Sequence, residues 1–196
     1  MKSNLRTCAI LIVGTIVTIT ALGFILGLDK HVAMNEKVSL PEPNEPQIVV
    51  HKADRKLELF DGDKLIKTYK IALGNAPLGD KEEEGDMKTP EGEFYIFGKN
   101  PKSKYHLGLG ISYPDITDAK RGSESGLVSK EEVEQIEAAI ARREMPPQKT
   151  KLGGEIYIHG GGTASDWTEG CIALSDADVT ELYELVGKGT PITILK

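Results

Sequence analysis

A histidine and a cysteine stand close together in one glycine-rich stretch, IYIHGGGTASDWTEGCIALSD, which spans residues 156–176. A thiol with a pKa near 8.5 is mostly protonated at neutral pH, so it needs a neighbouring base before it can attack a carbonyl. His159 and Cys171 could supply that pair. Gly170 permits an unusual turn that leaves backbone N–H groups uncovered, as an oxyanion hole requires. The stretch is therefore typical of acyl transfer through a cysteine nucleophile.

Each of these residues also has an ordinary structural interpretation. A histidine at the end of a strand is commonly a hydrogen-bonded structural residue, Trp167 commonly belongs to a core, and a free cysteine commonly packs as a small hydrophobe. Zinc is a further alternative, because His106, His159, Asp166 and Cys171 carry suitable donor atoms. The tight CxxC or HExxH spacings of zinc sites are absent, however, so we expect no metal and no cofactor. Spacing alone leaves the dyad and the structural interpretation open.

The elements around this stretch predict how the histidine is presented. In the strand EIYIH, Ile156 and Ile158 point to one face, and Tyr157 and His159 point to the other. His159 therefore leaves the strand end beside three glycines, which let the backbone approach whatever occupies that space. Six further short strands are predicted, at residues 48–52, 56–60, 64–73, 91–97, 106–113 and 190–195, with an Asp61-Gly62 hairpin between the second and third.

Two helices are predicted from capping signals. Ser129 opens a capping box before apolar residues at helical spacing that end near Met145, and Ser175 opens a second helix that reaches Val186, with Gly187 as its C-terminal cap. The fold class is therefore mainly β, in the α+β sense: a sandwich or barrel of short strands with two or three helices. We assign it to residues 47–196, and the polar, proline-bearing residues 29–46 to a linker.

The N-terminal part of the chain predicts export. Residues 8–28 carry no charge, and 21 residues at about 1.5 Å each span a hydrocarbon core of roughly 30 Å. Lys2 and Arg6 precede this segment, so residues 1–7 should stay in the cytoplasm. A cleaved signal peptide is the alternative, although its apolar region would be shorter. We expect a single-pass protein of the cytoplasmic (inner) membrane with its domain on the periplasmic or extracellular side.

Charge and cysteine content limit the function classes further. Cys8 lies in the apolar segment, so Cys171 is a lone thiol in an oxidising compartment. The net charge is −6, which gives no electrostatic case for binding nucleic acid. The acidic run at residues 80–84 is expected to be a solvated loop.

The motifs taken together resemble the L,D-transpeptidase family, the YkuD-type catalytic domain of bacterial cell-wall enzymes. The resemblance rests on His159-Gly160 followed by Asp-Trp-Thr-x-Gly-Cys and Ile-Ala-Leu-Ser at residues 166–175. Upstream it rests on GDMKTPEGEF, YHL, ISYP, PPQ and LGG, in that order along the chain. It covers about 150 residues, from 47 to 195. Several linked motifs are far more specific than Gly-Cys alone, so the resemblance favours the catalytic dyad.

The resemblance implies roles for individual residues. Cys171 would be the nucleophile and His159 its base, with the Gly160 carbonyl orienting the imidazole. The oxyanion would be held by the N–H groups of Gly170 and Cys171. The substrate would contact Thr168, Trp167 and His106. This chain departs from the better-known pattern at Glu169, where many members have His or Arg, at Ala173, and in a short gap between histidine and cysteine.

The implied reaction is acyl transfer on peptidoglycan stem peptides, in cell-wall biogenesis and cell shape. Cys171 would attack the carbonyl on the L-centre of a diamino acid, expel D-alanine and form a thioester that an amine resolves. Three alternatives stay open. Water could resolve the thioester, as in an L,D-carboxypeptidase or an amidase that acts on stem peptide or wall-attached protein. The domain could be a silent peptidoglycan-binding module, or a spacer. The resemblance also implies that a carbapenem acylates Cys171.

Overall fold

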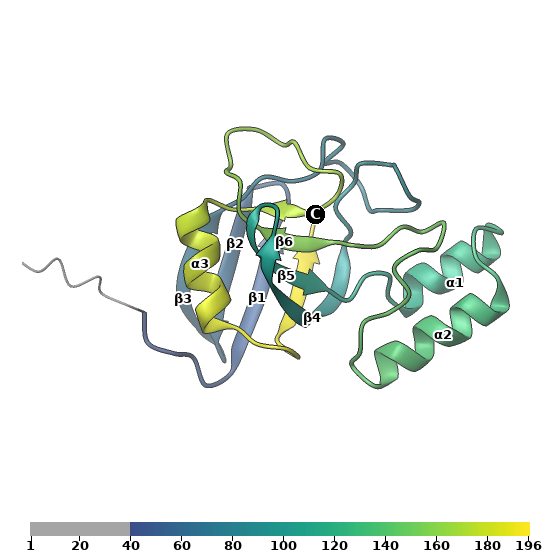
Figure 1. Cartoon of the computed structure of the whole chain (residues 1–196), viewed down its shortest axis with the longest axis horizontal. Coiled ribbons are helices and arrows are strands. Elements are labelled where there is room, and N and C mark those ends of the chain that lie inside the picture. The colour runs from purple at the N-terminus through teal and green to yellow at the C-terminus, as the bar shows by residue number, and fades with distance from the viewer. Residues whose placement is uncertain (1–39) are drawn as a thin grey trace, which may run out of the picture. The chain divides into compact units, whose positions relative to one another are not determined.

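Eight strands form one mixed sheet in the order β3-β2-β1-β8-β4-β5-β6-β7 (Figure 1). The structure is a computed structural model that describes residues 40–196, which form one compact unit. The strands are β1 (Pro46–His51), β2 (Lys56–Asp61), β3 (Lys64–Lys70), β4 (Gly92–Ser103), β5 (His106–Ile111), β6 (Tyr157–His159), β7 (Ile172–Ala173) and β8 (Pro191–Leu195). Neighbours pair antiparallel except β1 with β8 and β6 with β7, which are parallel.

The sheet curls until its two edges meet. The chain leaving edge strand β3 forms a bridge from Ala72 to Ala173 on the other edge strand, β7, and a second bridge from Gly74 to Thr168. One apolar core fills the curl. Every strand contributes to it, as does helix α3, and within β7 only Ala173 is left out of the core. Ile48, Leu59 and Leu109 are nearly inaccessible to solvent. The predicted mainly β class is confirmed. The curl brings the residues after β3 against the stretch that holds Cys171.

Three helices accompany the sheet: α1 (Ile116–Glu124), α2 (Lys130–Ala141) and α3 (Asp176–Leu185). Helices α1 and α2 lie together on one flank, and α3 lies on the other against β5 and β6 (Figure 1). Both predicted N-caps are confirmed, because Ser129 and Ser175 accept hydrogen bonds from the third helical N–H. Helix α3 ends on Val186 in extended conformation, so the expected cap at Gly187 is wrong.

Helix α1 has its own small core with α2. Ala119, Val128, Ile136 and Leu152 form a buried cluster separate from the main core. The α1–α2 pair therefore anchors the loop that follows α2, because Leu152 belongs to that loop. Gln148 holds the same loop: its amide nitrogen donates to the carbonyls of Tyr113 and Pro146, and its amide oxygen accepts from the Glu155 N–H at 2.7 Å.

The N-terminal predictions lie outside this description. The expected cytoplasmic residues 1–7, the membrane segment 8–28 and most of the linker precede residue 40. Among residues 40–196, no helix combines the length and the apolar character that a membrane crossing requires.

Candidate active site

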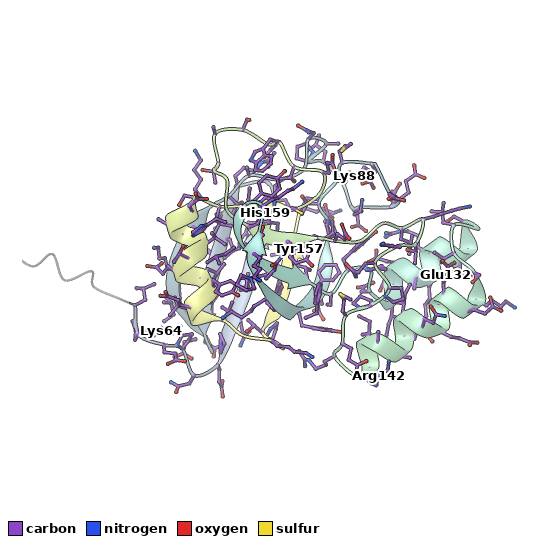
Figure 2. All side chains as sticks on the ribbon, viewed as in Figure 1. Lys64, Lys88, Glu132, Arg142, Tyr157 and His159 are labelled. Atoms are coloured by element: carbon purple, nitrogen blue, oxygen red, sulfur yellow. The ribbon has the colours of Figure 1, made fainter. Side chains whose placement is uncertain are left out.

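The register of β6 and β7 brings Cys171 alongside the strand that carries His159. Ile158 pairs with Ile172 and His159 with Ala173, so Cys171 stands opposite Tyr157. Tyr157 and His159 point to the same face, with backbones about 6.6 Å apart at 3.3 Å per residue. Figure 2 shows both side chains at the centre of the molecule. The two residues predicted to act together thus line the same cavity.

The His159 imidazole is held in one orientation. Its Nδ1 lies 2.6 Å from the Gly160 carbonyl oxygen. Because a carbonyl can only accept, Nδ1 carries the hydrogen, and Nε2 of the neutral ring has a free lone pair. Tyr105 stacks on the ring at a centroid distance of 4.6 Å, and Trp167 contacts it edge-on at 5.5 Å. Nε2 is therefore the atom that can accept a proton.

Burial keeps this imidazole neutral. The pKa of His159 is lowered, chiefly because burial disfavours the charged ring and secondarily because the Lys104 ammonium repels it, whereas the bond to the Gly160 carbonyl acts in the opposite direction. At neutral pH the ring is thus a base rather than a cation.

The Cys171 thiol is half-buried, and its partners are backbone groups of the neighbouring segment. Sγ accepts a weak hydrogen bond from the Tyr157 N–H at 3.4 Å and lies 3.5 Å from the Glu155 carbonyl oxygen, to which the S–H donates. Within residues 40–196, the His159 imidazole is not among the hydrogen-bond partners of the thiol. In this state the thiol donates to the Glu155 carbonyl, so that hydrogen bond must break before the proton can pass to Nε2.

The surroundings of the thiol hold it protonated at rest. Burial raises the pKa of Cys171 to about 11 and outweighs the hydrogen bond from the Tyr157 N–H, which lowers it. The Glu169 and Glu155 carboxylates raise the pKa further, and the Lys104 ammonium lowers it. A neutral thiol beside a neutral imidazole is thus the resting state.

Gly160 occupies a position where no larger residue fits. A Cβ there would lie 2.4 Å from Oδ1 of Asp176 and 2.9 Å from the Tyr105 carbonyl oxygen. Both neighbours belong to the loop's own support, since Tyr105 accepts the Gly160 N–H and Asp176 accepts the Gly161 N–H. The glycine-rich loop is packed tightly against β5 and α3, and this packing aims the Gly160 carbonyl at His159.

A tight turn leads into Cys171. The Thr168 hydroxyl donates to the Cys171 carbonyl at 2.7 Å and accepts from the Gly170 N–H at 3.2 Å. Gly170 has φ 130°, and a Cβ there would lie 2.8 Å from the Lys88 carbonyl oxygen. Of the two expected oxyanion donors, the Gly170 N–H is therefore already engaged by Thr168. The Cys171 N–H has no hydrogen-bond partner in the described part of the chain, residues 40–196, and is free for an oxyanion.

The thiol and the imidazole open onto a cavity of about 930 Å³. Its walls come from four segments: the loop at 81–87, the β4–β5 hairpin, the loop at 148–155 and the turn at 167–171. Thr168 and Trp167, which the sequence analysis expected to contact the substrate, both line the cavity. Trp167 is fixed there because its Nε1 donates to the Gly162 carbonyl. The space is large enough for an extended peptide.

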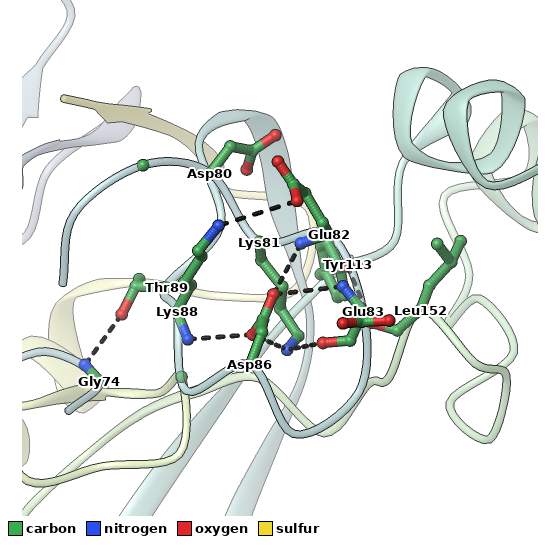
Figure 3. A network of polar contacts seen from close by, with 12 residues as sticks. Gly74, Asp80, Lys81, Glu82, Glu83, Asp86, Lys88, Thr89, Tyr113 and Leu152 are labelled. Carbon is green, nitrogen blue, oxygen red and sulfur yellow. Dashed lines mark hydrogen bonds and ion pairs between the residues drawn. The ribbon is translucent and has the colours of Figure 1, made fainter. Parts of the chain in front are cut away.

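The wall formed by residues 81–87 is a loop whose glutamates are exposed and whose lysine, Lys81, is buried. Lys81 is only 2% exposed, and its ammonium donates to Asp86 at 2.8 Å and to the Glu83 carbonyl. Asp86 accepts three backbone N–H groups as well (Figure 3). Burial alone would raise the pKa of Asp86, but these hydrogen bonds lower it overall. The loop expected at residues 80–84 is confirmed and its three glutamates are exposed, but the buried ammonium of Lys81 organises the run, which the sequence did not predict.

Two other residues of the sequence analysis lie away from the dyad. His106 starts β5 with φ 73°, and its Nε2 bonds to the Thr180 hydroxyl on α3, outside the residues that line the cavity. Asp166 forms an ion pair with Arg55 at 2.8 Å and accepts the Leu73 N–H. The donor atoms of the zinc alternative are thus dispersed, and residues 40–196 contain no group of three or more His, Cys, Asp or Glu side chains that could hold a metal ion.

Sequence reasoning did not identify the aromatic and charged neighbours of the dyad. Tyr105, which stacks on His159, was not predicted to belong to the site, whereas the next residue, His106, was. Lys104 lines the cavity with its ammonium 4.8 Å from the Tyr105 ring centre. Alternation along β5 would put His106 on the face of His159, because Gly108 pairs with His159, so the sequence held no signal for Tyr105. The turn at the hairpin tip and the φ of 73° at His106 break this alternation.

Comparison with known proteins agrees with this geometry. The YkuD family profile, described as an L,D-transpeptidase catalytic domain, matches residues 45–194. The chain is 34% identical over 146 residues to the putative L,D-transpeptidase YafK of Escherichia coli K12, an alignment that covers 71% of this chain and 46% of YafK. The chain thus spans about half the length of the curated relatives it matches.

Solved structures share the fold at lower identity. The helical cell shape determining protein Pgp2 of Campylobacter jejuni has a TM-score of 0.54 and 23% identity, covering 83% of this chain and 52% of Pgp2. Bd1075 of Bdellovibrio bacteriovorus has a TM-score of 0.51 and 21% identity, covering 80% of this chain and 52% of Bd1075. With the family match over 150 residues, the thiol and imidazole on one cavity place the chain in the L,D-transpeptidase family, as a protein with a YkuD catalytic domain.

Proposed function

We propose that this chain is a cysteine acyltransferase that acts on peptidoglycan stem peptides, cleaving the bond between the L-centre of the diamino acid and D-alanine. The observation that carries the proposal is the pairing of a free thiol with an imidazole whose Nδ1 is fixed by the Gly160 carbonyl, both on one cavity. This arrangement leaves Nε2 as the base and the sulfur as the nucleophile, which are the two groups that acyl transfer requires.

The first half-reaction forms a thioester. Nε2 of His159 takes the proton from Sγ of Cys171 as the sulfur attacks the carbonyl carbon. The new oxyanion lies within reach of the Cys171 N–H, and the carbon–nitrogen bond to D-alanine then breaks. The imidazolium returns its proton to the departing amine, so D-alanine leaves as a neutral amine and His159 is neutral again.

The second half-reaction releases the acyl group. An amine of a second stem attacks the thioester carbonyl and gives its proton to Nε2, the carbon–sulfur bond breaks, and the imidazolium reprotonates the sulfur. Water in place of the amine gives hydrolysis by the same steps, as in an L,D-carboxypeptidase, and a wall-attached protein could likewise supply the amide that is cleaved. We propose the exported, membrane-anchored location predicted from residues 8–28, where the cell wall is accessible.

The test is product analysis with the full chain, purified with a mild detergent because of its apolar N-terminal segment. Incubation with tetrapeptide muropeptides is expected to release D-alanine and give cross-linked dimers by mass, whereas tripeptides alone would identify hydrolysis. Cys171→Ala should abolish release while unfolding at the same urea concentration as the wild type. Retained release by Cys171→Ala would refute the proposal.

A covalent probe provides an independent readout of the nucleophile. A carbapenem is expected to add once to the wild-type chain and not to Cys171→Ala, as measured by intact mass. An adduct of equal yield on the variant would show that another residue reacts.

A further inference from the structure

Four lysines line the cavity in two pairs. Lys102 and Lys104 lie on the β4–β5 hairpin, and Lys149 and Lys151 lie on the loop that leads into β6. All four are exposed. In the part of the chain that the structure describes, none of them forms an ion pair or a side-chain hydrogen bond with a carboxylate, whereas the fifth lysine of the cavity, Lys81, is neutralised by Asp86. For a chain of net charge −6, this is a local excess of free positive charge.

The two pairs stand at opposite ends of β6. Gly108 pairs with His159, and the hairpin continues beyond that point to the Ser103–His106 pair, so Lys102 and Lys104 lie past the histidine end of the strand. The loop that carries Lys149 and Lys151 closes at the other end of β6, where the Gln148 amide oxygen accepts the Glu155 N–H. The thiol stands between them, because its contacts are with Tyr157 and Glu155. A peptide that places its scissile carbonyl on the sulfur therefore extends toward a lysine pair in each direction.

The centre of the cavity has the opposite charge. Glu155 and Glu169 line it beside the thiol, both are exposed, and both act on the thiol as negative charges. A third exposed glutamate, Glu84, lines the cavity next to the second lysine pair, because its N–H donates to the Lys151 carbonyl. The four free lysines still outnumber the three glutamates. A ligand carboxylate is repelled beside the sulfur and attracted at the two ends, since an ammonium group binds carboxylates as a point charge. The distribution of charge thus favours ligands whose carboxylates lie at the two ends of the cavity and not beside the sulfur.

We propose that the two lysine pairs bind free carboxylate groups of the stem peptide on both sides of the scissile bond, so that stems with free carboxyl groups are favoured over stems whose carboxyl groups are amidated. This inference rests on the proposed function, because it takes the stem peptide as the ligand. It adds which chemical form of the stem the site accepts and which residues distinguish the forms.

Binding to the inactive full chain tests the inference without turnover. Cys171→Ala is titrated by calorimetry with a stem tetrapeptide whose side carboxyl groups are free and with the same peptide carrying amidated groups. The variants K102Q/K104Q and K149Q/K151Q are compared, in the same background, with K64Q/K70Q. The control removes two exposed lysines of β3, and Figure 2 shows Lys64 well away from His159. It changes the net charge by the same amount, so bulk charge is controlled.

The free peptide is expected to bind more tightly than the amidated one, and the preference should shrink as salt rises. Removing either cavity pair should raise the Kd for the free peptide roughly 2- to 30-fold, the range for two solvent-exposed ion pairs, and should leave binding of the amidated peptide nearly unchanged. Equal affinity for the two peptides, no binding of either, or equal effects of cavity and control variants would overturn the inference. Failure of wild-type D-alanine release would instead count against the proposed function, because it is measured separately from binding.

Discussion

Replacement of Gly160 by alanine tests whether the backbone carbonyl orients the catalytic base. The added Cβ would lie 2.4 Å from Oδ1 of Asp176, about 1 Å short of the 3.4 Å at which ordinary contact begins, and 2.9 Å from the Tyr105 carbonyl oxygen. Oδ1 of Asp176 accepts the Gly161 N–H, and the Tyr105 carbonyl accepts the Gly160 N–H, so moving either neighbour breaks a hydrogen bond that holds the loop. The loop must therefore shift by about 1 Å, and the carbonyl 2.6 Å from Nδ1 moves with it.

The size of the effect follows from that shift. A misplacement of about 1 Å at a catalytic group can cost roughly 100-fold in rate. Overpacking of a buried site lowers the free energy of unfolding by about 1–3 kcal/mol. Gly160→Ala should therefore release D-alanine about 100-fold more slowly while it remains folded, and its urea midpoint should fall. The rate is measured by D-alanine release, and stability by urea unfolding followed by circular dichroism.

Two further variants isolate the cause. Gly98→Ala on β4 is the matched control, because its Cβ meets no atom within 4 Å and its φ is not positive. It should have wild-type activity. Adding Asp176→Ala to Gly160→Ala removes the closest contact and should recover part of the rate. An activity of Gly160→Ala within threefold of Gly98→Ala would show that the carbonyl does not position the imidazole.

Three other perturbations probe the electrostatics of the site. Alkylation of Cys171 by iodoacetamide should rise about tenfold per pH unit from neutral pH toward the thiol pKa of about 11, with no plateau near neutrality, and a plateau there would indicate a preformed thiolate–imidazolium pair. Glu169→Gln removes a carboxylate that raises the thiol pKa, so alkylation at about pH 8 should be roughly 1.5- to 5-fold faster, and a slower reaction would contradict the assigned sign. The pKa of Asp166 is lowered overall because the Arg55 and Leu73 hydrogen bonds outweigh the effect of burial, so the stabilisation is present above the unfolded pKa of about 3.9 and is lost as pH falls through the lower folded value. Asp166→Asn should thus lower the urea midpoint at about pH 7 and have little effect at about pH 2, and an equal loss at both would point to packing instead.

Local patterns predicted most of the strands and two of the helices. Ser129 and Ser175 could be predicted as N-caps because the capping pattern lies within three residues of each helix start. Helix α1 was missed although Asp115 and Asp118 form a capping box. Its nine residues, ITDAKRGSE, bury only one apolar side chain, that of Ala119. The sequence therefore lacks the apolar repeat of 3.6 residues that would predict a helix there. Tertiary packing, rather than amphipathic pattern, identifies this helix.

The sequence predicted that Cys171 and His159 share one site, and both line the same cavity, but it did not predict the supporting residues. Cys171, His159 and Gly160 belong to one short segment, whereas the partner of Asp166 is Arg55, 111 residues away. Tyr105, rather than the predicted His106, lies beside His159 for a local reason. His106 adopts φ 73° at a tight hairpin tip, so its side chain turns toward Thr180. A left-handed conformation at a histidine is not legible from sequence. A non-local ion pair therefore explains why Asp166 lies away from the dyad, and one unusual dihedral angle explains why His106 does.

The neutral resting state of the dyad fits the charge of the ligand that the lysines select. A permanent thiolate between two substrate carboxylates would add a further negative charge to a cavity that already holds Glu84, Glu155 and Glu169, and the like charges would oppose binding. With Cys171 protonated and His159 neutral, the sulfur acquires its charge only as the new carbon–sulfur bond forms and passes that charge to the oxyanion. The barrier then includes the proton transfer, but the acidic substrate binds without repulsion from its own nucleophile. The raised thiol pKa and the free lysines are in this way two parts of one arrangement, and a variant that brings the thiol pKa below the assay pH should bind the free-carboxylate stem less tightly unless it also removes a glutamate.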